Sequence, residues 1–246
     1  MARNTLPSGI HDLLWLAERM LAGRETHGPW LRLGTAEEFA QALAAMRAAE
    51  SAFANARTRK AEAGRRGAAA DAALTAWLAK ARLVVMLALG SEWSERWLAA
   101  GFTHRATNVP KRSGWRIELG RSVVGFFEAH PEFALPFAGV TASEGRAVHG
   151  ELTDSATEMR EAAREVGQRK RTRDAVEKHL RWKMRGTVLM LSAMLEKGDP
   201  RWLAFGLNVP KPGAVARTTV PTTPNAAAVQ VAFFAPEPGT RLTEVA

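Results

Sequence analysis

A closing motif that occurs twice constrains the fold of this 246-residue chain more than any other feature. Residues 96–102 (RWLAAGF) match residues 201–207 (RWLAFGL) at a spacing of 105, and the tetrapeptide Asn-Val-Pro-Lys soon follows each copy. Upstream, Trp77 matches Trp182 at the same spacing. Because self-similarity at one fixed period is the signature of a repeat, these matches indicate a tandem duplication of one structural unit.

A helix start is predicted at the same place in each copy. Thr35 is followed three residues later by Glu38, and Thr141 by Glu144, which is the spacing of a capping box. In this motif the threonine hydroxyl accepts from a backbone N–H of the first turn, and the carboxylate reaches back to the cap. Apolar residues then recur at helical spacing, at Phe39, Leu43, Met46 and Phe53 in the first copy and at Val148, Leu152, Met159 and Val166 in the second.

Glycines interrupt both long helical patterns. Gly64 and Gly67 in the first copy, and Gly167 in the second, mark places where the chain can turn back. Without a turn, each region would be a single helix about 80 Å long at 1.5 Å per residue. We therefore expect two antiparallel helices in each copy, the second running from about residue 68 to 89 and from about 172 to 195.

Shorter helical segments complete each unit. An apolar segment precedes each hairpin, at 10–22 and 117–129, and one or two turns follow it, at 94–100 and 200–205. The expected fold class is all-α, a tandem duplication of a four-helix unit built on a long antiparallel hairpin. The expected domains are repeat 1 (1–113), repeat 2 (114–211) and a tail (212–246).

The tail differs in composition from the repeats. Five prolines after Pro210 exclude a helix there, and residues 226–235 (AAAVQVAFFA) favour an extended strand. One strand is too little to fold alone, so it docks on the helices, pairs with another chain or stays mobile. The residues expected to form this interaction strand are Val229, Val231, Phe233 and Phe234.

The repeats and the N-terminus carry a family resemblance. Residues 3–8 (RNTLPS) and the ending from Arg201 to Pro210 resemble a group of uncharacterised bacterial proteins with two alanine-rich helical repeats. Many of those proteins continue into a fibronectin type III domain, whereas this chain ends after about one β-strand. The resemblance implies the helical architecture and names no catalytic residue.

Charge and residue usage bound the function. The net charge of +9 implies affinity for polyanions, although a GC-rich genome explains abundant arginine and alanine equally well. The chain has no cysteine, which excludes disulfides and thiolate metal sites. The longest apolar run, 83–89, is far shorter than the roughly 20 residues of a membrane span. We therefore expect a cytoplasmic protein with no signal peptide and no membrane contact.

Two basic clusters provide the sharpest functional hint. Each falls near a predicted hairpin tip, so the two tips are hypothesised to bind phosphates of a nucleic acid or another polyanion. No aromatic residue is interleaved with either cluster, which argues against base stacking, and a charged tip that only keeps the protein soluble is the alternative. The clusters are Arg57, Arg59, Lys60, Arg65 and Arg66, and Arg164, Arg169, Lys170, Arg171 and Arg173.

Histidines and tryptophans are weaker candidates. His149 and His179 lie on the long helices of the second copy and could face each other near Glu177, but no metal-binding motif surrounds them. Trp97 and Trp202 recur at matching positions, where a buried indole can anchor the short helix while its N–H finds a carbonyl. We predict no catalytic residue, metal or cofactor.

Three functional hypotheses remain. The first is a non-enzymatic structural or interaction protein, in which the helices form a scaffold and the tail strand pairs with another chain or subunit. The second is a nucleic-acid-binding protein that uses the basic tips. A metal-dependent enzyme is the third.

Overall fold

The computed structural model describes residues 4–27, 34–103 and 105–211, and these residues are mostly helical. The all-α prediction is confirmed for them. The elements are α1 (Ile10–His27), α2 (Ala36–Leu89), η2 (Glu95–Ala100), α3 (Ser113–Ala129), η3 (Pro131–Phe133), η4 (Pro136–Ala138), α4 (Ala142–Met194) and α5 (Arg201–Ala204). The chain divides into two compact units, Met1–Pro210 and Lys211–Ala246, and the first is described here.

Both predicted helix starts are confirmed. The hydroxyl of Thr35 accepts a hydrogen bond from the backbone N–H of Glu38 at 3.1 Å, and α2 begins at Ala36, directly after this cap. The hydroxyl of Thr141 accepts from the backbone N–H of Glu144 at 3.2 Å, and α4 begins in the same way. Each threonine satisfies one of the N–H groups that the first turn leaves without an intrahelical partner.

The predicted hairpin turns are wrong. α2 has 54 residues and α4 has 53, and Gly64, Gly67 and Gly167 lie inside them without a positive φ. A glycine inside a helix costs only about 1 kcal/mol relative to alanine. The surrounding residues are mainly Ala, Arg, Glu and Lys, which favour the helix, and no proline lies between Thr35 and Leu89. The glycine penalty is therefore too small to end either helix.

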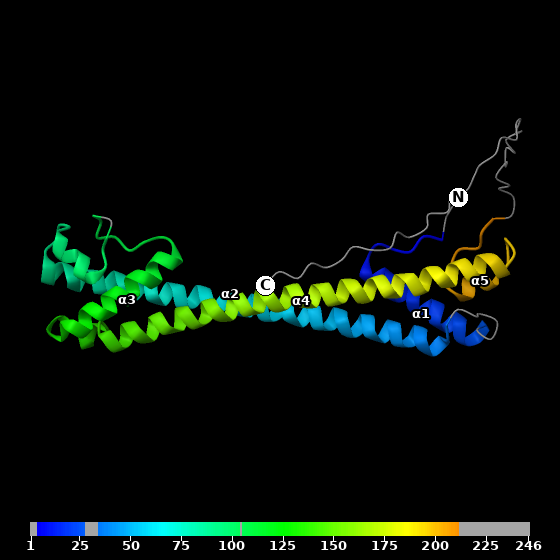
Figure 1. The fold of residues 1–246 in the computed structure, drawn as a ribbon, viewed down its shortest axis with the longest axis horizontal. Coiled ribbons are helices and arrows are strands. Elements are labelled where there is room, and N and C mark those ends of the chain that lie inside the picture. The colour runs from blue at the N-terminus through cyan, green and yellow to red at the C-terminus, as the bar shows by residue number, and fades with distance from the viewer. Residues whose placement is uncertain (1–3, 28–33, 104, 212–246) are drawn as a thin grey trace, which may run out of the picture. The chain divides into compact units, whose positions relative to one another are not determined.

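The two long helices run antiparallel along each other (Figure 1). Ion pairs between them occur near one end, where Lys183 Nζ lies 3.3 Å from Glu38 Oε2, and near the middle, where Arg59 Nη1 lies 3.4 Å from Glu165 Oε1. Each long helix therefore packs against the other long helix and does not fold back on itself.

Each end of this helix pair carries its own hydrophobic core. One core combines the second half of α2 with the first half of α4, α3 and η2, and its buried side chains include Leu74, Trp77, Trp97, Phe127 and Leu152. The other combines α1, the first half of α2, the second half of α4 and α5, and its buried side chains include Met20, Phe39, Leu180, Met184 and Phe205. Each core is therefore built from both halves of the sequence, in place of the predicted core within one hairpin.

Neither core includes the stretch between them. We call residues 53–66 of α2 and 158–173 of α4 the central segment. The buried residues of α2 in this segment are alanines, Ala56 and Ala63, seven residues apart. Small side chains at heptad spacing let two helices approach closely but bury little apolar surface. The two helices therefore hold each other here with ion pairs and a narrow alanine seam.

The closing motifs seal the two cores as expected. Trp97 and Trp202 are both buried, which confirms the predicted burial of the two indoles. The indole N–H of Trp202 donates to the carbonyl of Glu196 at 3.4 Å, but that of Trp97 has no hydrogen-bond partner among the described residues. Gly101 adopts a φ of +88°, and a Cβ there would lie 2.3 Å from Ser122 Cβ, so the motif requires glycine at this position.

One helix in the described part of the chain, α2, is long and apolar enough to cross a membrane by length and composition alone. Its apolar half carries Leu74, Trp77 and Leu78, which are buried in a core. Core helices of water-soluble proteins have the same property, so this finding carries little weight.

Candidate functional site

The two predicted basic clusters do not lie on tips. Because α2 and α4 are continuous, residues 57–66 and 164–173 lie midway along them, and the antiparallel pairing brings the clusters side by side in the central segment. The prediction of two separate basic tips is therefore wrong. The structure instead places Arg57, Arg59, Lys60, Arg65, Arg66, Arg164, Arg169, Lys170, Arg171 and Arg173 in or beside one stretch of a two-helix pair.

Four of these cations are held in ion pairs. Arg59 lies 3.4 Å and Arg169 3.6 Å from Glu165. Arg66 pairs with Glu158 across the two helices. Arg173 lies 3.8 Å from Glu50 and 2.6 Å from Asp174. Arg59, Arg66 and Arg173 thus pair across α2 and α4, whereas Arg169 pairs within α4. Because all four cations already have anionic partners, they are less suited than unpaired cations to binding an external anion.

The other members of the clusters are exposed. The cluster members that form no ion pair with another described residue are Arg57, Lys60, Arg65, Arg164, Lys170 and Arg171. Arg57 and Arg173 both lie over the ring of Phe53, at 5.9 and 4.6 Å from its centroid. This aromatic face is therefore covered by guanidinium groups, and the surface provides charge for phosphate contacts rather than rings for base stacking.

The predicted interaction strand lies outside the described residues. Val229, Val231, Phe233 and Phe234 belong to the tail, so the strand stays a prediction from sequence.

The two candidate histidines, His149 and His179, do not face each other. His149 packs in one core, where a Cβ on Gly120 would lie 3.3 Å from its ring, whereas His179 stacks on Trp182 at 6.1 Å near the other core. The continuous α4 separates the two rings by 30 residues of helix, about 45 Å. Among the described residues, no group of three or more His, Asp or Glu side chains is arranged to hold a metal ion.

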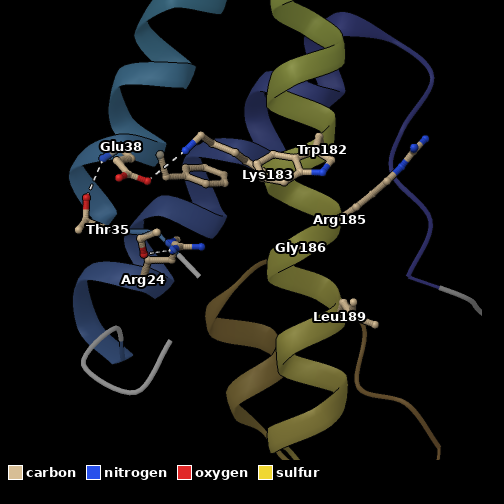
Figure 2. A pocket seen from close by; sticks show the side chains of 10 residues that line it. Arg24, Thr35, Glu38, Trp182, Lys183, Arg185, Gly186 and Leu189 are labelled. Atoms are coloured by element: carbon tan, nitrogen blue, oxygen red, sulfur yellow. Dashed lines mark hydrogen bonds and ion pairs between the residues drawn. The ribbon is translucent and has the colours of Figure 1, made fainter. Parts of the chain in front are cut away.

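A cavity that no sequence pattern indicates lies beside the second core. It has a volume of about 380 Å³ and lies between the start of α2, the end of α1 and the last third of α4. Its wall includes Phe39 of α2 and Trp182, Gly186 and Leu189 of α4 (Figure 2). Trp182 is 64% exposed and Leu189 is 69% exposed, so an apolar surface faces solvent here.

A buried arginine forms one side of this cavity. Arg24 is 4% exposed, donates from Nη1 to Thr187 Oγ1 at 2.8 Å, and donates from Nη2 to the carbonyl of Gly34 at 2.7 Å. Its guanidinium also lies 5.4 Å from the ring centroid of Phe39. Burial lowers the pKa of Arg24, and the nearby Glu38 carboxylate opposes that effect. Arg24 thus joins α1, α4 and the residue that precedes the cap of α2.

The remaining charges lie at the cavity edge. Lys183 is mostly buried and reaches across from α4 to Glu38, while Arg185 points away from both (Figure 2). The cavity wall therefore carries more positive than negative charge. No periodic pattern or motif marks these residues in the sequence, because a cavity arises from side chains that are absent or turned outward.

Comparison of the chain with protein-family models, with curated proteins and with solved structures finds no match in any of the three.

Proposed function

We propose that the protein is a non-enzymatic helical scaffold that holds two separate ends apart and engages protein partners. The observation that supports this is the central segment, where α2 and α4 continue between two cores without contributing a residue to either. A chain that only needed a stable fold would close its cores without this stretch, because apolar burial there is small. In this proposal, the extra helical length serves to hold the two ends of the helix pair apart.

We further propose that the tail strand supplies the contact, and that the simplest partner is a second copy of the chain. Support comes from the sequence of residues 226–235, whose alternating Val229, Val231 and Phe233 suit the edge of a sheet. Strand addition makes backbone hydrogen bonds and demands little of the partner sequence. The duplication of the helical unit remains part of this proposal and rests on the repeated motifs.

Sedimentation velocity of the full chain over a range of concentrations tests this proposal. We expect association of the wild-type chain, and loss of that association in Val231→Pro, because proline removes a strand donor. Val231→Thr keeps the donor and the β-branched shape, so it should associate as the wild type does. A chain that stays monomeric at every concentration would remove the tail-pairing proposal.

Binding of a polyanion is a second candidate function, favoured by the meeting of the two basic clusters in the central segment. Fluorescence polarisation with duplex DNA and duplex RNA, from low to physiological salt, should show affinity that falls linearly on a log–log plot. Charge reversal at the unpaired Lys60 and Arg171 should weaken binding, whereas reversal at Arg121 on α3 should not. Absence of salt-sensitive binding at low ionic strength would exclude this candidate.

A further inference from the structure

We propose that the cavity between α1, α2 and α4 binds a small organic anion with a flat apolar body, such as an aryl carboxylate or aryl sulfonate. Its volume of about 380 Å³ falls in the range of about 300–1,000 Å³ typical of small-molecule sites. The cavity combines an apolar wall with a few charged groups, which is also the usual composition of such sites.

In the first core, the place that matches this cavity is filled by a tryptophan ring. At the first core, the Trp77 ring occupies the space over Gly145, where a Cβ would lie 2.3 Å from the indole. The repeat alignment matches Trp77 with Trp182, and Gly145 with Phe39 one residue out of register. Phe39 fills the space that Gly145 leaves free, so the Trp182 ring stays outside and forms an exposed wall.

The position of Gly186 keeps the cavity open along α4. A Cβ built on Gly186 would meet no atom within 4 Å, so the helix surface beside Trp182 and Leu189 is free. A planar ring can lie on this surface against the exposed Trp182 indole, an arrangement favoured for aromatic pairs. The apolar body of the ligand is therefore assigned to the strip formed by Trp182, Gly186 and Leu189.

The charge of the ligand follows from the cationic groups at the other side. Arg24 and Lys183 face one carboxylate, Glu38, and the start of α2 adds the positive end of a 54-residue helix at Thr35. The Lys183 ammonium has three N–H donors, and its partner Glu38 is more than half exposed to water. A ligand anion near Lys183 would provide a second acceptor for these donors. An anion is favoured here over a cation, which the arginine and lysine would repel.

Two fluorescent probes that differ mainly in charge test this proposal. The probes are 8-anilinonaphthalene-1-sulfonate and the neutral N-phenyl-1-naphthylamine, each titrated into the full chain. We expect saturable binding of one sulfonate probe per chain, and at least tenfold weaker binding of the neutral probe. Equal affinity for both probes would overturn the assignment of an anionic ligand.

Variants on α4 locate the binding. Gly186→Leu fills the cavity and should weaken sulfonate binding at least tenfold, whereas Gly167→Leu, also in open space on the same helix, should change it less than twofold. Lys183→Met should weaken the sulfonate several-fold and leave the neutral probe unchanged, and it needs no new space in the fold. Sulfonate binding that is unaffected by both Gly186→Leu and Lys183→Met would place the probe elsewhere and refute the site.

Discussion

The contact between Trp77 and Gly145 offers a sharp test of how the two halves of the chain pack. A Cβ on Gly145 would lie 2.3 Å from Cζ2 and 2.5 Å from Cη2 of the Trp77 ring, and 2.8 Å from Cγ2 of Val124. The ring is 5% exposed and packs edge-on against Phe127, with centroids 6.2 Å apart. It therefore has little freedom to move away from a new methyl group.

Gly145→Ala combines two opposing effects. Overpacking a filled core lowers the free energy of unfolding by about 1–3 kcal/mol, while replacing glycine by alanine in a helix raises it by about 1 kcal/mol. Gly150→Ala on the same helix is the matched control, because a Cβ there meets nothing within 4 Å, and it should stabilise the protein by about 0.5–1 kcal/mol. The difference between the two variants isolates the overpacking, about 1–3 kcal/mol.

Guanidinium unfolding of both variants, with comparison of midpoints at unchanged m values, measures that difference. A second mutation, Trp77→Leu, removes most of the ring and should relieve the clash, so the double-mutant cycle should show a favourable coupling of at least 0.5 kcal/mol. In a hairpin fold Trp77 would instead face residues near Ala54 of its own copy. Equal stabilisation by the two alanine variants, with no coupling to Trp77→Leu, would refute the packing of α2 on α4.

Three further predictions concern helix continuity, capping and the buried arginine. Gly64→Ala and Gly167→Ala should each raise the free energy of unfolding by about 0.5–1 kcal/mol, since both glycines are helical, whereas destabilisation of either would indicate a turn. Thr35→Ala should lower it by about 1 kcal/mol through loss of the cap, with Thr35→Ser retaining most of it, and a neutral alanine variant would contradict the capping. Arg24→Met should lower it by about 1–3 kcal/mol, because the buried Thr187 hydroxyl loses a donor and the Gly34 carbonyl loses one as well. Thermal melts of Arg24→Met beside the exposed control Arg121→Met measure this effect, and equal melting temperatures would argue against a structural role for Arg24.

Local features of the fold are predictable from the sequence because they depend on neighbouring residues. The hydroxyls of Thr35 and Thr141 cap helices for reasons contained within four residues. The buried Trp97 and Trp202 follow from a repeated motif in which glycine allows the close turn. These features would be the same whether the long helices folded back or not.

The pairing of the long helices is not predictable in this way. Folding back at Gly64 and continuing through it differ by a small local free energy, so distant contacts decide the outcome. One such contact is Trp77 with Gly145, which joins residues of different halves, while Phe39 occupies the matching place in the other core. The predicted place of the basic clusters at helix tips depends on the predicted turns. Because α2 and α4 are continuous, the clusters lie in the central segment instead.

The cavity could not be predicted for a related reason. It depends on the missing side chain of Gly186 and on a Trp182 ring that stays outside the core, and neither leaves a periodic signal in the sequence. In the sequence, Arg24 is one of several basic residues, and nothing distinguishes it from those that lie on the surface. Its role depends on Thr187, which only the fold places beside it.

The distance between two labels on α2 tests the continuity of the long helices most directly. The chain has no cysteine, so Ala45→Cys and Leu87→Cys, both at exposed positions, provide the only sites for nitroxide spin labels. A continuous helix separates them by 42 residues, about 63 Å at 1.5 Å per residue. In a hairpin that turns near Gly64 and Gly67, they would face each other at an interhelical distance of about 10 Å, before the reach of the labels is added. Double electron–electron resonance, with labelled chains diluted in unlabelled protein, should give the long distance. With the reach of two labels added, the hairpin would give a distance below about 30 Å. A population at such short distances would contradict the continuous helix.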